Sequence, residues 1–528
     1  MTTDVEATPP TNPVPASDPA SRAARASARA AAATAARVTR RAPGDLPLAF
    51  ATEESVRARA TSAAEPAWLL ADRLAGLARF AELPLETNRL YTLYVDMRGA
   101  DLDDMAPYLD GPALAATDAA DPAHLPAEAD GLVEIRGGAV PVVVLSAAAR
   151  AAGVVLEPLD ALVARDPSRA RGLLDDGADL PADDKLAQLA RALWTTGVHL
   201  HVPAGSSLEG PIVLRFAAGI PGRAVLARTL VTLGEGARAS IVEEIVPAGP
   251  DIGCAAGETV PQSLLHVTTE VRLAADASLT FAGLQDLGHR AVVFTTRRSE
   301  LGPRAELRWA LAQVGARIAK SRVDNLLAGD GSSVEQVEIV FGADDQLFDL
   351  TSYTRHVGRD TTADLLSKAA MLDRSRSYIK GLTTIDRPAR GTDSFLGEFG
   401  MLLTKGSRSV TIPSLEIDQP DCRRVGHASS VGPIDPLQMF YLESRGIDPA
   451  DARRMIVLGF LEPVVARVPL AAEQDRLRGI LEAKWDASSA ATEANGPGAG
   501  AGAAGGHATA DGTTAAAGAG SPIAMGAA

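Results

Sequence analysis

Cysteine is almost absent from this chain of 528 residues, and aromatic residues make up only 4% of it. The two cysteines, Cys254 and Cys422, form no Cys-x-x-Cys pair and no cysteine/histidine spacing suited to zinc. So few thiols argue against a disulfide-rich secreted protein and fit a reducing compartment.

Long apolar runs are missing as well. The longest, GAVPVVVLSAAA at residues 138–149, ends at Arg150 and is too short to cross a bilayer. The first residues lack the charged-then-apolar pattern of a signal peptide, and Asp4, Glu6 and Asp18 do not fit a transit peptide. We therefore expect a soluble, cytoplasmic protein without a membrane partner.

The chain also lacks positive charge and the common catalytic motifs. Its net charge of −15 and the absence of a basic patch exclude a nucleic-acid partner. The dipeptide Gly-Lys never occurs, so there is no phosphate-binding loop and no nucleotide is expected on this chain. G-x-S-x-G and H-E-x-x-H are absent too, which favours a scaffold over an enzyme.

Composition and periodicity predict five regions. Residues 1–60, rich in Ala, Pro and Arg, and residues 487–528, rich in Gly and Ala, are expected to be disordered. Residues 61–190 read as a helical and mixed region, whose first helix is predicted to start at a capping box of Ser62 and Glu65. A strand-rich core at 191–434 and a helical docking region at 435–486 follow.

The core is a long series of short alternating runs separated by Gly and Asp turns, which is the signal of strands. Such a series fits either a sandwich or a β-solenoid. Small residues recur at similar corners, at separations of 28 to 44 residues, and favour the solenoid because stacked coils leave little room at the bends. They are Ala239, Ala277, Ala305, Ser333, Ser377 and Ser409.

Helix signals return after the core. Asp435–Pro436 and Asp448–Pro449 each read as an N-cap followed by proline in the first turn, and Gly446 is predicted to end the first helix. Pro463 is expected to kink the second helix.

Several stretches, in order, resemble the SufB/SufD family of the SUF iron–sulfur cluster assembly system. They are ALWTTGVHLHVPAGSSLEGPIVL, LGEGARASIVEE, LAADASLTFAGLQDLG, TSYTRHVGRDTTADLLSKAAMLDRSRSYIKG and, most specifically, GHASSVGPIDPLQMFYLESRGI. The resemblance covers roughly residues 65–470 and implies a mainly β fold, a right-handed parallel β-helix flanked by N-terminal and C-terminal helical segments. It also implies a complex with a SufC-like ABC-type ATPase and a SufB-like subunit, or a homodimer, and a transient iron–sulfur cluster shared with the partner.

Within the family the chain looks like SufD. Where the SufB pattern has a cysteine ahead of a Thr-Val-Pro strand, this chain has Ser407. Where SufB has Glu-His-Glu, this chain reads Gly426-His427-Ala428. Many SufD sequences carry a cysteine two residues before that histidine, and here the place is Val425, which counts against direct cluster ligation by this subunit.

The candidate ligand is His427, as a cluster or iron ligand or as a relay at a partner interface. The alternative is a structural histidine in a tight turn. Cys422 is a weaker candidate, with an incidental cysteine the favoured interpretation. His356 carries less weight than His427, and the strand pair His199 and His201 is assigned to packing.

The expected docking surface for the ATPase lies on the C-terminal helices. Its predicted members are Phe440, Tyr441, Arg445, Gly446, Phe460 and Leu461. Two other classes compete with the scaffold: a carbohydrate-active β-helix enzyme, which would need paired carboxylates and aromatic platforms, and a purely structural solenoid, which would need more regular repeats.

Overall fold

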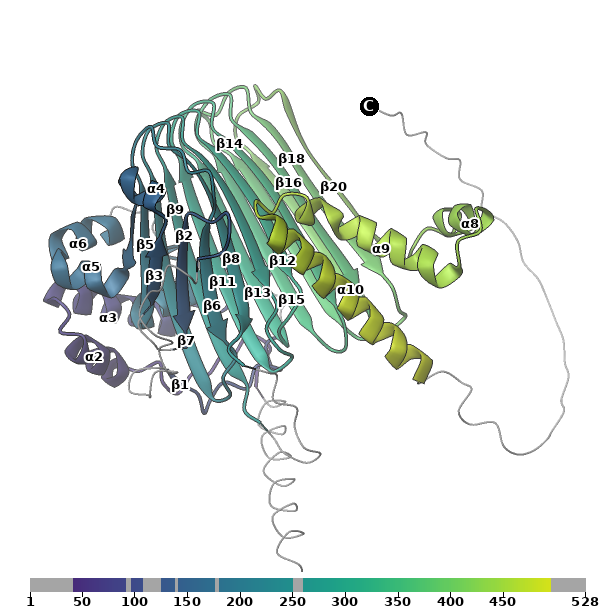
Figure 1. The fold of residues 1–528 in the computed structure, drawn as a ribbon, viewed down its shortest axis with the longest axis horizontal. Coiled ribbons are helices and arrows are strands. Elements are labelled where there is room, and N and C mark those ends of the chain that lie inside the picture. The colour runs from purple at the N-terminus through teal and green to yellow at the C-terminus, as the bar shows by residue number, and fades with distance from the viewer. Residues whose placement is uncertain are drawn as a thin grey trace, which may run out of the picture.

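The computed structural model describes residues 41–91, 96–107, 125–137, 141–175, 180–249 and 260–494. Its centre is a stack of coils in which successive strands alternate between two ten-stranded sheets (Figure 1). The prediction of a parallel β-solenoid flanked by helices is confirmed. Cys254 and the outer parts of both tails, residues 1–40 and 495–528, lie outside the described residues.

The first sheet contains the odd-numbered strands of the stack, paired in parallel from β5 to β19, and ends at an antiparallel strand β4. A short strand β1 pairs with β7 off this path. The bounds are β1 Ala106–Pro107, β4 Val155–Pro158, β5 Thr196–Val202, β7 Arg223–Leu233, β9 Ser263–Leu273, β11 Ala291–Leu301, β13 Ile318–Leu327, β15 Leu347–His356, β17 Arg376–Ile385 and β19 Arg408–Ile417.

The second sheet contains the even-numbered strands, paired in parallel from β2 to β20, and ends at the antiparallel strand β3. The bounds are β2 Gly131–Arg136, β3 Val142–Leu145, β6 Ile212–Ala218, β8 Arg238–Pro247, β10 Ser278–Gln285, β12 Glu306–Gln313, β14 Ser333–Gly342, β16 Thr362–Met371, β18 Asp393–Leu402 and β20 Arg424–Gly432. Since β2, β3 and β4 join the sheets, the solenoid begins well before the predicted boundary at residue 191.

Six successive coils share a corner that is built from the same two positions. A residue in the left-handed region comes first, and a fully buried small residue follows it just before a strand of the second sheet, from β8 to β18. The first position requires a positive φ, which Gly and Asp adopt most readily. The six pairs are Gly236–Ala237, Asp276–Ala277, Arg304–Ala305, Gly331–Ser332, Asp360–Thr361 and Gly391–Thr392.

The predicted corner set was therefore right at Ala277 and Ala305 and wrong elsewhere. Ser377 and Ser409 lie on strands of the first sheet and pair with each other in register. Ala239 and Ser333 lie one or two residues past their corners. A buried small residue is common inside strands as well, so size alone does not identify a bend.

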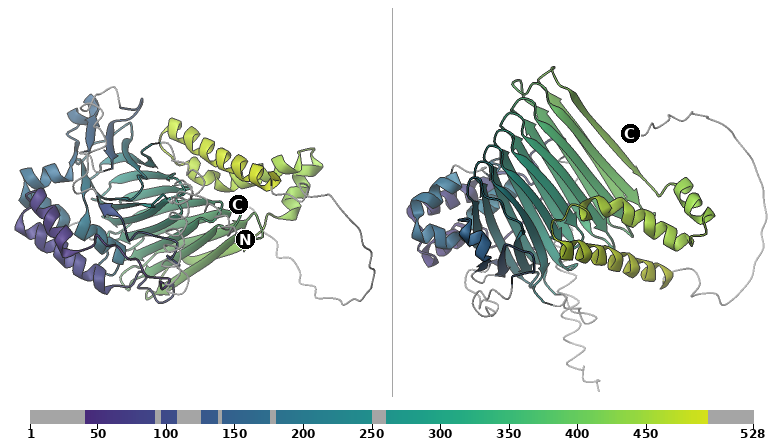
Figure 2. Two further views of the ribbon diagram at one scale, coloured as in Figure 1. Left: turned by 90° about the horizontal axis from the view of Figure 1, so that it is seen from below. Right: turned by 45° about the horizontal axis from the view of Figure 1, so that its top comes forward.

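Helices cover both outer faces of the solenoid, as the views from two sides show (Figure 2). The N-terminal helices pack on the first sheet through α7, which contacts β7, β9 and β11. The C-terminal helix α9 contacts β12, β14 and β16 of the second sheet. The bounds are α2 Glu53–Ser62, α3 Ala67–Glu82, α4 Ala147–Ala151, α5 Leu159–Arg165, α6 Pro167–Asp175, α7 Lys185–Leu193, α8 Pro436–Ser444, α9 Pro449–Val465 and α10 Ala471–Ala494.

The predicted capping box is wrong. Ser62 is the last residue of α2, a helix inside the segment expected to be disordered, and Thr52 caps that helix. Glu65 instead forms a buried ion pair with Arg73 at 2.7 Å, and Arg73 also donates to the carbonyl oxygens of Ala192 and Trp194. A tertiary partner overrode the local pattern, because a buried guanidinium needs a carboxylate beside it. At the other end, α10 continues past the predicted boundary at residue 487.

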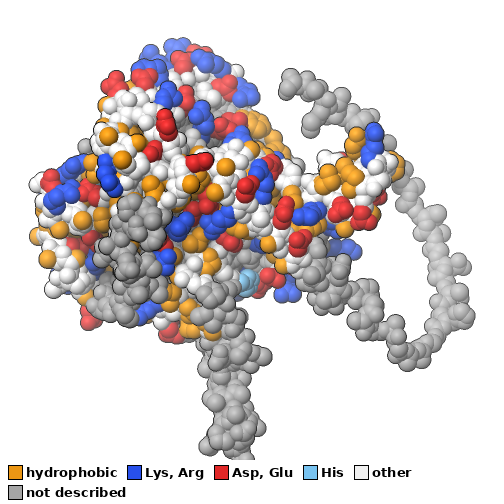
Figure 3. Space-filling view, viewed as in Figure 1, with side chains coloured by type: hydrophobic (Ala, Val, Ile, Leu, Met, Phe, Trp, Pro, Cys, Tyr) orange, Lys and Arg blue, Asp and Glu red, His pale blue; other side chains and the backbone are white. Residues whose placement is uncertain are grey.

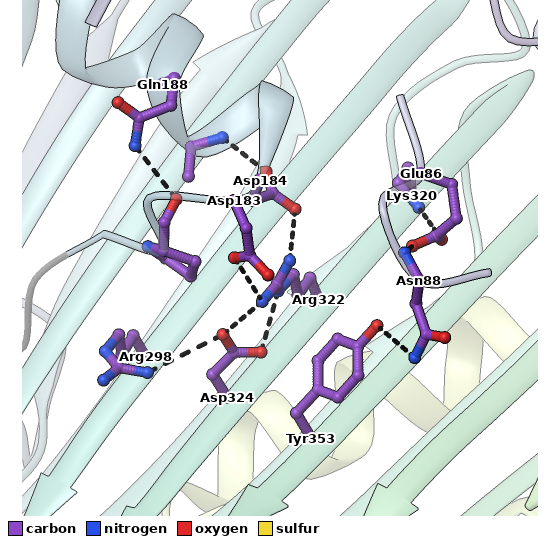
Figure 4. Close-up of polar contacts among 12 residues, drawn as sticks. Glu86, Asn88, Asp183, Asp184, Gln188, Arg298, Lys320, Arg322, Asp324 and Tyr353 are labelled. Carbon is purple, nitrogen blue, oxygen red and sulfur yellow. Dashed lines mark hydrogen bonds and ion pairs between the residues drawn. The ribbon is translucent and has the colours of Figure 1, made fainter. Parts of the chain in front are cut away.

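A network of charged side chains holds the N-terminal region on the first sheet (Figure 4). Asp184 caps α7 by accepting from the backbone N–H of Ala187 at 2.6 Å, and it also pairs with Arg322 of β13 at 2.9 Å. Arg322 pairs in addition with Asp324 at 2.8 Å. The Asp184 carboxylate thus caps the N-terminus of α7 and also fixes this helix on the first sheet.

Candidate functional site

The two ends of the solenoid are built differently. At the C-terminal end of the stack, β19 pairs only with β17 and β20 only with β18, so among the described residues nothing pairs with their outer edges. Such edges present unpaired backbone N–H and C=O groups. Two apolar side chains are exposed there, Ile417 at 48% and Val431 at 38%. This open end is a surface that another strand can extend.

His427 lies on β20 at this open end. It is in register with Leu396 of β18, which is buried in the solenoid interior. Val431 lies on the same face, since a Cβ added to the inward-facing Gly400 would lie 3.2 Å from its Cγ2. The imidazole therefore belongs to the inward row and is exposed only because no further coil covers it. The alternative of a tight-turn histidine is wrong.

Glu398 occupies the next inward position along β18 and was not selected from the sequence. Its side chain is 1% exposed, and no side chain is hydrogen-bonded to either carboxyl oxygen, although the backbone N–H of Ile412 lies near it. Burial raises the pKa of this carboxyl to about 8. The signal in the sequence is a single acidic residue among apolar ones in the strand SFLGEFGML.

The structure makes space for this carboxyl across the interior. Gly381 of β17 faces it, and a Cβ at that glycine would lie 2.7 Å from Glu398 Oε1 and 2.6 Å from Leu396 Cδ2. Both distances are shorter than any ordinary carbon contact. Any larger residue at position 381 would displace the acid.

Cys422 lies in the loop that leads into β20. Its thiol donates to the carbonyl oxygen of Gln419 at 3.1 Å, and burial together with the neighbouring Asp421 raises its pKa. A thiolate is therefore disfavoured, whereas cluster ligation requires one. The described residues contain no group of three or more His, Cys, Asp or Glu placed to hold a metal ion. The donor set at the open end thus fits a shared site and does not fit a complete cluster site on this chain.

A second uncovered surface is the helix α8, which projects away from the solenoid (Figure 1). None of its residues is buried, and its apolar side chains are the most exposed of their kind in the described chain: Leu437 at 74%, Phe440 at 68% and Tyr441 at 58%. Hydrophobic side chains are visible on this lobe in the space-filling view (Figure 3).

The predicted start and stop signals of this helix are confirmed. Asp435 accepts from the backbone N–H of Leu437, and Gly446 follows the helix with φ +86°. Arg445 lies over the ring of Tyr441, 5.3 Å from its centroid. Phe440, Tyr441, Arg445 and Gly446 therefore share one projecting element.

The other two docking candidates lie elsewhere. Leu461 is fully buried where α9 packs on the second sheet, so the expectation that it faces a partner is wrong. Phe460 is partly buried in the same cluster, with Lys368 Nζ 4.7 Å from its ring centroid. The apolar stripe of α9 is used inside the molecule.

The remaining histidines have structural surroundings. His356 shares a hydrogen bond with the hydroxyl of Thr361 at 2.8 Å, and burial lowers its pKa to about 4. His199 lies 3.2 Å from a carboxylate oxygen of Glu157, and His201 lies 2.8 Å from the hydroxyl of Thr232. His199 and His201 lie on β5 at the other end of the stack, and His356 is buried on β15, two strands in from β19.

Together the features describe a β-solenoid with an open strand edge at one end and an exposed apolar helix that follows it. Residues 216–460 match the family model described as "SUF system FeS cluster assembly, SufBD core domain". The predicted resemblance of this part of the chain to the SufB/SufD family is therefore confirmed.

Curated relatives agree with this assignment. Proteins named "Iron-sulfur cluster assembly SufBD family protein" from Staphylococcus haemolyticus, Staphylococcus saprophyticus and Staphylococcus epidermidis are each 27% identical over 298 residues. The match covers 56% of this chain and 62% of the length of each relative. Among the described residues no helix is both long and apolar enough to cross a membrane.

Proposed function

We propose that this chain is a SufD-like scaffold subunit of a SufB–SufC–SufD type complex that assembles iron–sulfur clusters in the cytoplasm. In this role it performs no catalysis itself, is coupled to an ABC-type ATPase on another chain and helps to supply iron. The observation that carries the proposal is where the large apolar side chains are exposed. Six of the seven in the described chain lie at the open end or on α8 and α9: Ile417, Val431, Leu437, Phe440, Tyr441 and Met455.

The SufD-like assignment rests on cluster ligands that the SufB pattern has and this chain lacks. Ser407, where the SufB pattern has cysteine, donates its hydroxyl to the carbonyl oxygen of Thr404 at 2.9 Å and forms part of a turn. His427 has Gly426 and Ala428 beside it in place of two carboxylates. A subunit of this kind contributes one imidazole and leaves the thiolates of the cluster to its partner.

The helix α8 is proposed to bind the ATPase. An apolar helix face that lies outside the fold fits a hydrophobic groove on a partner, and exposed aromatic residues are typical anchors of such contacts. The cost of leaving Phe440 and Tyr441 in water is offset only if a partner covers them. Nucleotide hydrolysis would then move this helix without any nucleotide on this chain.

The open end is proposed to pair with a second solenoid, either a SufB-like subunit or another copy of this chain. The unpaired edges of β19 and β20 allow both sheets to continue across the junction. His427 would then lie at the interface, where a partner can complete a site for iron or for the cluster.

Co-purification tests the ATPase contact. The full chain is co-expressed with the SufC-like and SufB-like proteins of the same host, and the amount of ATPase retained is measured by size-exclusion chromatography. The double variant Phe440→Ser/Tyr441→Ser should retain at least about tenfold less ATPase, because two aromatic anchors are removed.

The control is Leu90→Ser, which alters an apolar side chain that is 53% exposed in the N-terminal segment that packs on the first sheet. It should leave retention unchanged. If the wild-type chain forms no complex with either partner, the proposed function is wrong. If the double variant binds the ATPase as well as wild type, α8 is not the docking helix.

A further inference from the structure

Three carboxyl groups share one inward row of the second sheet. Strand register places Glu338 of β14 opposite Ser367 of β16, Ser367 opposite Glu398 of β18, and Glu398 opposite Ser429 of β20. Glu243 of β8 lies in the same row further toward the N-terminal end. The row therefore runs along the solenoid interior and ends at the open end.

Only the last of these acids is left without a side-chain partner among the described residues. Glu243 forms an ion pair with Arg297, and Glu338 accepts from Gln313 Nε2 at 3.3 Å. Glu398 has no side-chain partner among the described residues, and the backbone N–H of Ile412 is the one donor directed at its carboxyl group. A buried polar group without a hydrogen bond costs about 1–3 kcal/mol, so such a group calls for an explanation.

The position of Glu398 indicates where its partner comes from. On its own sheet only the small residue Ser429, which is exposed, lies between it and the open end. Across the interior, Gly381 leaves room for the carboxyl. The acid is thus closed off toward the rest of the solenoid and separated from the open end by a single strand.

His427 lies on that strand and on the same face. Its register neighbour Leu396 is two residues from Glu398, so the two Cα atoms are about 8 Å apart, given the usual strand spacing and rise. An imidazole and a carboxylate that approach one ion from this separation are a common pair of ligands for divalent iron.

We propose that Glu398 and His427 together bind a divalent metal ion of the Fe²⁺ class at the open end of the solenoid, with the remaining ligands from water or a partner chain. This inference rests on the proposed function, because it identifies the cargo that the open end receives. It adds Glu398, a carboxyl ligand on this chain, to the histidine. Glu398→Gln keeps the size of the side chain and removes the ligand charge.

Metal titration of the full-length chain tests the pair. Co²⁺ is the optical probe, and Fe²⁺ is added under anaerobic conditions as the second metal. We expect wild type to bind one ion with the visible absorption of Co²⁺ in a nitrogen–oxygen site. Glu398→Gln and His427→Ala should each weaken binding at least about tenfold, the usual scale for losing a supporting group at a metal site.

Glu338→Gln is the matched control, since it makes the same change in the same row two coils away. It should bind Co²⁺ like wild type, and thermal unfolding of all variants shows that each one folds. Equal binding by wild type and Glu398→Gln, equal loss in Glu338→Gln, or no binding by wild type would each overturn the inference.

The outcome can be separated from that of the proposed function. Complex formation with the SufC-like and SufB-like proteins is scored on the same Glu398→Gln preparation. If the complex forms normally and Glu398→Gln binds Co²⁺ like wild type, only the proposed metal site is wrong. If the wild-type chain forms no complex, the proposed scaffold function is wrong. The metal titration of the isolated chain still tests whether Glu398 is a ligand.

Discussion

At the scale of single residues, the open end depends on which side chains are absent as much as on which are present. Gly381 carries no side chain, and this lets the Glu398 carboxyl and Leu396 occupy the interior opposite it. The surrounding strand is otherwise regular, and Gly381 has no positive φ that would require glycine. Its role is therefore to provide space.

Gly381→Ala should destabilise the protein. Alanine is favoured over glycine in strands by up to about 1 kcal/mol, but the added Cβ would lie 2.7 Å from Glu398 Oε1 and 2.6 Å from Leu396 Cδ2. Overpacking of this kind costs about 1–3 kcal/mol, so the clash outweighs the propensity. Chemical denaturation should show the midpoint fall with an unchanged m-value.

Gly426→Ala provides the control, because a Cβ there would meet nothing within 4 Å. Gly426 lies in β20 of the second sheet, and the free energy of unfolding of this variant should stay equal to that of wild type or rise slightly. If both variants behave alike, the space opposite Glu398 is not needed.

The residue scale also shows where prediction from sequence succeeds and where it stops. His427 could be selected because it stands alone in a recognisable motif. Glu398 could not, because alternation predicts that a residue faces the interior but not whether a neighbouring coil supplies a partner. Leu461 was misassigned for a related reason, since an apolar helix stripe looks the same whether a sheet of the same chain or another protein covers it.

At the scale of elements, α10 is held on the solenoid by two titratable groups of unusual pKa. Lys484 donates to the carbonyl oxygen of Val314 and to Gln346 Oε1, and burial lowers its pKa to about 7 despite the nearby Asp286 and Asp344. These contacts lie toward the C-terminal half of the helix.

The second group is Glu473, in the first turn of α10. Burial and the neighbouring Glu244 raise its pKa to about 7, although Arg476 lies 3.1 Å away and Arg215 pairs with Glu244. A protonated Glu473 can share a hydrogen bond with the Glu244 carboxylate, whereas two carboxylates repel each other.

The two shifts predict a minimum in the local stability of α10 near pH 7. Between about pH 4.5 and 7 the folded state keeps a proton on Glu473 that the unfolded state has lost, so stability falls as pH rises. Between about pH 7 and 10.5 the unfolded state keeps a proton on Lys484 that the folded state has lost, so stability rises with pH. Hydrogen exchange of α10 amides, corrected for the intrinsic effect of pH, measures both changes.

Two variants separate the contributions. Glu473→Gln should abolish the fall below pH 7 and keep the rise above it, and Lys484→Met should do the reverse. Protection that changes in one direction only across this range in the wild-type chain would contradict the prediction.

At the scale of the whole molecule, the described solenoid is terminated by antiparallel strands at its N-terminal end and has open strand edges at its C-terminal end. The antiparallel strands β3 and β4 terminate the sheets at the N-terminal end, where α5 packs against β4 and β5. The C-terminal end has no such terminating strand among the described residues. Period-two alternation and turn spacing predicted the strands but fitted a sandwich as well as a solenoid, and the family resemblance implied the β-helix. These patterns are local and carry no information about which edge stays unpaired.

Charge placed on this end should prevent pairing. In the variant Ile417→Lys/Val431→Lys two exposed apolar side chains become cations, and edge lysines are a common natural means of blocking strand addition. We expect the isolated wild-type chain to form dimers that dissociate on dilution, or to pair with the SufB-like subunit, and the variant to remain monomeric in both settings. Sedimentation velocity at several concentrations measures this.

Thr61→Lys is the control for added charge, since Thr61 is exposed on α2, which packs on α3 and α7 toward the N-terminal end of the stack. It should associate like wild type, and both variants should unfold at nearly the wild-type temperature because neither position is buried. If the double variant pairs as strongly as wild type, the solenoids do not join through this end. The exposed imidazole of His427 would then face solvent in the assembled complex, where no partner strand could complete the site that it forms with Glu398.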